Sequence, residues 1–112
     1  MELIETLNAS LQYLERHLLE DTDSEKVAKY VGLSRFYLER TFAALTGMSV
    51  SEYIRARRLT LAAQELIAAE TKVIDLALKY GYDTPESFTK AFTRFHGVTP
   101  SSARRMSTML RC

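Results

Sequence analysis

Two groups of side chains lie 50 residues apart and carry related sets of polar and aromatic groups. Each group contains pairs three or four positions apart, and on a helix this spacing places residues close together on the surface. The groups consist of Arg35, Phe36, Glu39 and Arg40, and of Glu86, Ser87, Thr89 and Lys90.

Side chains of these types can read the edges of DNA bases. Arg40 can donate to guanine O6 and N7, and Glu39 can accept a hydrogen bond from cytosine N4. The ring of Phe36 and the methyl group of Thr89 can contact thymine methyl groups. We therefore interpret both groups as candidate base-reading residues for the major groove of double-stranded DNA.

A second set of residues is suited to the phosphate backbone. Ser34 and Thr84 can each cap a helix whose free N–H groups and positive dipole end bind phosphate oxygens. Basic side chains on or near the ends of predicted helices are further candidates, although each alone also fits an ordinary solvated surface charge. They are Arg55, Arg57, Arg58, Lys72, Arg94 and Arg104.

The elements that must position these residues are all helical. Apolar spacing, caps and glycine stops predict an all-α fold without strands. Asp23, Ser34 and Thr84 are expected N-caps, and Ser49 with Glu52 forms an S-x-x-E capping box. The seven expected helices span residues 4–19, 24–30, 35–46, 50–69, 73–80, 85–96 and 100–106.

Aromatic and leucine residues at helical spacing predict the core. One expected inner face holds Leu38, Phe42 and Leu45, and the other holds Phe88, Phe92 and Phe95. The tyrosines are expected at the edge of the core with their hydroxyls outward. They are Tyr13, Tyr30, Tyr53, Tyr80 and Tyr82.

An internal repeat organises the chain. Each copy consists of a short helix, a glycine turn, a capped helix and a glycine stop, which are the parts of a helix-turn-helix unit. Ala28 and Gly32 match Ala77 and Gly81 at an offset of 49 residues. At an offset of 50, the segment from Ser34 through Leu38, Arg40, Phe42, Leu45 and Gly47 matches Thr84, Phe88, Lys90, Phe92, Phe95 and Gly97.

The repeat predicts two subdomains joined by a linker helix. We expect a first helix-turn-helix over 1–47, a linker over 48–70, a second helix-turn-helix over 71–106 and a flexible tail over 107–112. A helix of about 20 residues is ~30 Å long, and successive major-groove entries on one face of B-DNA lie ~34 Å apart. The recognition helices 35–46 and 85–96 are therefore expected to read two adjacent major-groove segments.

Charge is distributed unevenly along the chain. Residues 1–31 hold seven acidic and three basic side chains, whereas residues 32–112 hold seven acidic and twelve basic ones, so the net charge of +1 divides into −4 and +5. This pattern fits a basic body that faces an anion, with the acidic first helix turned away from it.

Other functions find little support in the sequence. Charges interrupt every apolar stretch before ~18 residues, so no membrane span is expected, and the absence of a signal-like start favours a cytoplasmic protein. His17 and His96 lack metal-ligand spacing, and no catalytic set or cofactor motif is present. We therefore expect no enzyme activity, metal, cofactor or small-molecule site, and Cys112 is a weak candidate for a reactive thiol.

The second copy resembles the signature of the AraC/XylS family of regulators. The resemblance is carried by D-L-A-L-K-Y-G-Y-D-T-P-E-S-F-T-K-A-F from Asp75 to Phe92, and by Gly97-Val98-Thr99-Pro100 followed by Arg104. It extends over roughly Leu3 to Arg105 and implies two helix-turn-helix units that bind asymmetric promoter sites. It also implies activation of transcription through RNA polymerase in the bacterial cytoplasm, in association with the nucleoid.

The resemblance also assigns positions. The family's base-reading places fall on Phe36, Glu39 and Arg40 in the first unit, and on Glu86, Ser87, Thr89 and Lys90 in the second. Pro85 stands where some members have a polar reader, and Ala103 stands where many have an aromatic residue. Because Glu86 is acidic, the second unit is expected to bind DNA more weakly.

Two alternatives to a DNA-binding regulator are a helical protein-interaction module that docks through the acidic first helix, and an alkyl-transfer domain with Cys112 as acceptor. The family's usual sensing domain has no counterpart in the sequence. This fits a small regulator controlled by its abundance, and it also fits the DNA-binding part of a longer protein.

Overall fold

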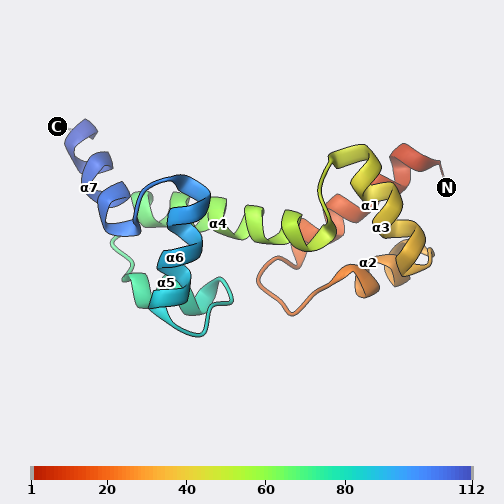
Figure 1. Cartoon of the computed structure of the whole chain (residues 1–112), viewed down its shortest axis with the longest axis horizontal. Helices are drawn as coiled ribbons and strands as arrows, with labels where there is room; N and C mark the ends of the chain where they lie inside the picture. The colour runs from red at the N-terminus through yellow and green to blue at the C-terminus, as the bar shows by residue number, and fades with distance from the viewer. Residues whose placement is uncertain (1, 112) are drawn as a thin grey trace. The chain divides into compact units, whose positions relative to one another are not determined.

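Seven α-helices make up the part of the chain that the structure describes, with no strand among them (Figure 1). The structure is a computed structural model, and it describes the backbone of residues 2–111 and the side chains of residues 2–108. The helices are α1 (Leu3–Arg16), α2 (Ser24–Val31), α3 (Arg35–Thr46), α4 (Val50–Ala68), α5 (Val73–Lys79), α6 (Pro85–His96) and α7 (Pro100–Arg111).

The expected all-α fold is confirmed, and two helix ends differ from the prediction by more than one residue. The first helix ends at Arg16 instead of Leu19, because the chain turns at His17 and buries Leu18. The seventh continues to Arg111 instead of stopping near Met106, because no glycine or proline follows Pro100 to end it.

The repeat is visible in the backbone hydrogen bonds. Leu33 N–H donates to Ala28 O over 2.9 Å after the left-handed Gly32, and Tyr82 N–H donates to Ala77 O over 2.8 Å after Gly81. This is the 6→1 bond of a Schellman motif, which needs a residue with positive φ and therefore favours glycine. Both short helices thus end in the same way, and each leads directly into a capped recognition helix.

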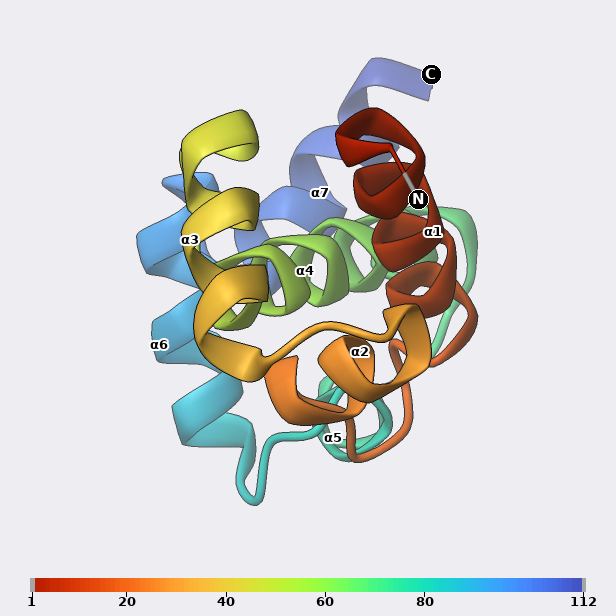
Figure 2. The same cartoon turned by 90° about the vertical axis from the view of Figure 1, so that its right-hand side faces the viewer.

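Contacts divide the chain within α4 into one unit that ends at Arg55 and another that begins at Ala56. In the first unit α2 packs against both α1 and α3 (Figure 2). Its buried side chains include Leu14, Val27, Leu38, Phe42 and Val50. In the second unit α6 packs against α5 and α7. Its core cluster is formed by Leu59, Ala62, Leu66, Leu76, Ala77, Tyr80, Phe88 and Phe92.

The last turn of each recognition helix departs from the predicted core. Leu45 and Phe95 were expected to face inward, but 40% of Leu45 and 47% of Phe95 is exposed. The next residue, Thr46 or His96, is half-buried in each case. Thr46 Oγ1 accepts from Met48 N–H over 3.1 Å, and His96 Nε2 lies 2.9 Å from Leu59 O on α4. These half-buried residues make polar contacts at the helix end, while Leu45 and Phe95 remain exposed.

Replacing Phe92 with alanine should therefore cost far more stability than replacing Phe95. Phe92 is 1% exposed, and emptying such a site costs about 3–5 kcal/mol. The matched Phe95→Ala variant should lose about 1 kcal/mol or less. Urea unfolding followed by circular dichroism would measure both, and equal losses would show that Phe95 belongs to the core.

Candidate nucleic-acid interface

The first recognition helix, α3, presents an aromatic side chain next to a guanidinium. The N-cap Ser34 accepts from Tyr37 N–H over 3.1 Å, which fixes the start of the helix. Phe36 is 72% exposed, and the Arg40 guanidinium lies 5.6 Å from the centre of its ring. This distance allows a cation–π contact, so the two side chains are held together on the surface before any ligand binds.

The other two predicted readers of α3 have partners inside the first unit. Arg35 Nε donates to Ser24 Oγ on α2 over 3.2 Å, although Arg35 remains exposed. Glu39 is half-buried, and its Oε1 accepts from the backbone N–H of Val50 over 3.3 Å. Sequence reasoning missed both contacts, because each joins residues 11 positions apart on different helices.

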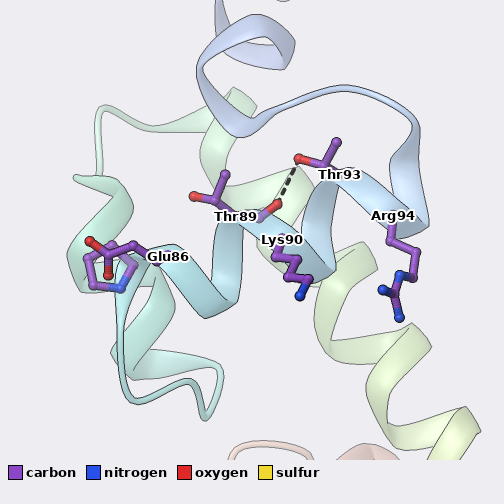
Figure 3. A pocket seen from close by; sticks show the side chains of 6 residues that line it. Glu86, Thr89, Lys90, Thr93 and Arg94 are labelled. Carbon is purple, nitrogen blue, oxygen red and sulfur yellow. Dashed lines mark hydrogen bonds between the residues drawn. The ribbon is translucent and has the colours of Figure 1, made fainter.

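The second recognition helix, α6, carries a shallow hollow along its outer side. Figure 3 shows five of its lining residues in order along the helix, from Glu86 at one end to Arg94 at the other. Thr93 Oγ1 donates back to Thr89 O over 2.7 Å. The hollow is lined by Pro85, Glu86, Thr89, Lys90, Thr93 and Arg94. Three of the four predicted readers of α6 therefore share one continuous surface.

Ser87 is the exception among these readers. Its backbone N–H donates to the N-cap Thr84 Oγ1 over 3.1 Å, and its hydroxyl donates to Thr84 O over 2.9 Å. The side chain is exposed but does not line the hollow. Ser87 thus contributes first to the helix start that also positions Thr84 and Pro85.

The basic candidates fall into two kinds. Arg55, Lys72 and Arg94 are exposed. Arg58 is half-buried, and its Nη1 lies so close to Gly81 that an added Cβ would come within 3.0 Å of it.

Arg104 on α7 is also engaged within the protein. It donates to the backbone carbonyl oxygens of Leu66 over 3.2 Å and Ala69 over 3.4 Å, and also to Thr71 O. It thereby satisfies carbonyls at the end of α4, and we do not retain it as a phosphate contact.

Glu65 on α4 forms hydrogen bonds with two residues at the end of α5. Glu65 accepts from Lys79 Nζ over 2.7 Å and from the Tyr80 hydroxyl over 3.0 Å. The bond from Lys79 holds the pKa of Glu65 below its ordinary value, and burial beside Glu65 raises the pKa of Tyr80 to about 12. Tyr80 was expected at the core edge with its hydroxyl outward, but it is buried because Glu65 supplies an acceptor.

Among the described residues, no group of three or more histidine, cysteine or acidic side chains is arranged to hold a metal ion. In the same part of the chain, no helix is both long and apolar enough to cross a membrane. Cys112, the candidate thiol, lies outside the described residues.

Known proteins with similar sequences show which family this architecture belongs to. A family model described as a helix-turn-helix domain matches residues 27–106. The transcriptional activator AarP of Providencia stuartii is 38% identical over 98 residues, which cover 88% of this chain and 73% of AarP. The regulatory protein SoxS of Salmonella typhimurium is 37% identical over 103 residues, covering 92% of this chain and 94% of SoxS.

Solved structures of related proteins have the same fold. An AraC-type regulator from Chromobacterium violaceum superposes with a TM-score of 0.88 at 26% identity and covers 93% of each chain. The DNA-binding domain of AdpA, solved with a target DNA, gives a TM-score of 0.84 at 25% identity and covers 95% of this chain and 96% of that one.

The fold and the exposed recognition helices define a DNA-binding domain with two helix-turn-helix units. The chain belongs to the AraC/XylS family of transcription regulators. It is a sequence-specific DNA-binding regulator, and the comparisons do not support the alternative of a protein-interaction module.

The Glu65 contacts predict an acid-dependent loss of stability. Because the folded-state pKa of Glu65 is lowered from its ordinary 4.5, its contribution is present above that value and is lost as the pH falls through the folded-state pKa. Glu65→Gln should therefore lower stability near pH 7 and flatten its change between about pH 5 and 3. Urea midpoints across this range would measure it, with the exposed Glu70→Gln as control. An unchanged pH profile in Glu65→Gln would contradict the assignment.

Proposed function

We propose that the protein activates transcription by inserting α3 and α6 into two adjacent major-groove segments of promoter DNA. The observation that carries the proposal is the duplicated unit, in which each second helix is capped by Ser34 or Thr84 and exposes a polar or basic surface. The naming of AarP as a transcriptional activator and the solution of AdpA with a target DNA support it.

Each helix has its own reading chemistry under this proposal. On α3, Arg40 donates to guanine while Phe36 contacts a thymine methyl group, and Arg35 lies at the groove edge. On α6, Thr89 contacts a thymine methyl group and Lys90 donates to guanine. Glu86 and Ser87 complete this set, and the acidic Glu86 weakens the approach of α6 to phosphate.

Phosphate contacts then fix the register of the protein on the duplex. The helix starts at Ser34 and Thr84 offer backbone N–H groups, and Arg55, Lys72 and Arg94 offer exposed cations. Arg58 contributes from its position over Gly81. The protein would act at the nucleoid in the bacterial cytoplasm, with RNA polymerase as its partner and with no chemical step of its own.

The extent of the match differs among relatives. The chain covers 94% of SoxS and 73% of AarP, but it covers 34% of the transcriptional regulator Rob of Salmonella typhimurium. The region matched in this chain therefore makes up almost all of SoxS and about a third of Rob.

Selection of binding sites from a random duplex library tests the two-helix arrangement. The protein should enrich an asymmetric site with two boxes about one helical turn apart. Arg40→Ala should relax base preference in one box and Lys90→Ala in the other, each at a cost of about 1–3 kcal/mol for the preferred base. A single box would remove one helix from base reading, and no enrichment at low or moderate salt would reject DNA reading.

Salt dependence separates phosphate contacts from structural arginines. Arg94→Ala should weaken binding similarly for all sequences and reduce the slope of log K against log salt by about 1, since one phosphate contact is lost. Arg104→Ala should leave that slope unchanged and lower the thermal midpoint, because its partners are backbone carbonyls. Fluorescence anisotropy across a salt series would measure both variants, and a reduced slope in Arg104→Ala would restore it as a phosphate contact.

A further inference from the structure

The internal repeat places the start of α4 and the start of α7 at corresponding positions. At an offset of 50 residues, Val50 at the start of α4 corresponds to Pro100 at the start of α7, and both are buried. The first N–H groups of a helix have no partner within the helix. Val50 carries such an N–H, whereas Pro100 has none. The two copies therefore differ in whether this position needs a hydrogen-bond acceptor.

The capping box of α4 does not supply a hydrogen-bond acceptor for Val50 N–H. Ser49 Oγ accepts from Glu52 N–H over 3.1 Å, and Glu52 Oε1 accepts from Ser49 N–H over 2.9 Å. Neither bond involves Val50 N–H, which donates instead to Glu39 Oε1 over 3.3 Å. At the start of α7, Thr99 Oγ1 accepts from Ser102 N–H over 3.1 Å, and Pro100 requires no acceptor.

Glu39 and the corresponding residue of the second copy differ in the same way as the two helix starts. The position that matches Glu39 in the second copy is Thr89, which lines the outer hollow of α6. Glu39 is half-buried, and its carboxylate lies at the positive dipole end of α4, where a negative charge is favourable. Turning it toward a base would leave the N–H of a buried residue without an acceptor, which is unfavourable.

We infer that Glu39 is a positioning residue that caps α4 and ties α3 to it, and that it does not read a base. The inference deepens the proposed function and rests on it for the statement about base reading, but the capping contact stands on the hydrogen bonds alone. The first box is then read mainly by Phe36 and Arg40. In the second copy, proline at position 100 leaves Thr89 available to the DNA.

A double-mutant cycle tests the cap without DNA. Glu39→Ala should lower the midpoint of thermal unfolding by about 4 °C, the order expected for loss of one helix cap. In a Val50→Pro background, which imitates the second copy, the same substitution should cause little or no further loss. Equal losses in both backgrounds, or no loss in either, would overturn the capping role.

Amide exchange at Val50 gives a second readout that does not depend on how the proline variant folds. Hydrogen exchange followed by NMR should show faster exchange of the Val50 amide in Glu39→Ala than in the unaltered protein, with the Leu33 amide as an internal control. An unchanged rate at Val50 would overturn the inference.

Base preference provides the third test. A glutamine at position 39 that reached the groove would favour adenine where glutamate favours cytosine. Glu39→Gln should therefore leave the selected site unchanged, while the matched Thr89→Ala should relax one position of the second box. A switch from cytosine to adenine would overturn the inference. If the unaltered protein selects no site, the proposed function fails, and the thermal cycle and amide exchange still decide the capping role.

Discussion

Helix ends impose the constraint on which the rest of the structure depends. Each α-helix leaves several backbone N–H and C=O groups unpaired at its ends, and short helices have a large share of such groups. In this chain α2 and α5 have only 8 and 7 residues. The position of each recognition helix therefore follows from how the neighbouring ends are capped, by Ser34 and Thr84 at their starts and by glycines at their stops.

Capping explains which features could be predicted from the sequence. N-caps, the capping box and glycine stops are local signals, so the helix starts and the repeat could be derived from residues close in sequence. Contacts between distant residues could not. Glu39 with Val50, His96 with Leu59 and Arg104 with Leu66 join positions 11, 37 and 38 residues apart. A helical pattern shows which residues share a face, but it does not show which partner that face meets.

The two copies solve the same constraint with different chemistry. At the end of α3 a threonine hydroxyl donates to Phe42 O, and at the matched end of α6 a histidine ring packs at a tilted angle against Phe92 and reaches Leu59 O. The surfaces have diverged as well: α3 exposes Phe36 beside Arg40, while α6 has threonines with Lys90 and Arg94 on its outer hollow. Under the proposed function, this divergence would let one chain recognise an asymmetric site, because two identical helices would favour two identical half-sites.

Reading DNA and holding the fold compete for the same side chains. A polar residue near the outer side of a recognition helix can face a base only if no buried backbone group requires it. Arg104 and Glu39 are on the structural side of this division, because Arg104 donates to a carbonyl near the end of α4 and Glu39 accepts from an N–H at its start. Lys90 and Arg94 lie on an open surface of α6. The specificity of each unit is therefore set partly by residues outside the recognition helix, since a single proline at a helix start decides whether a neighbouring polar side chain is needed as a cap.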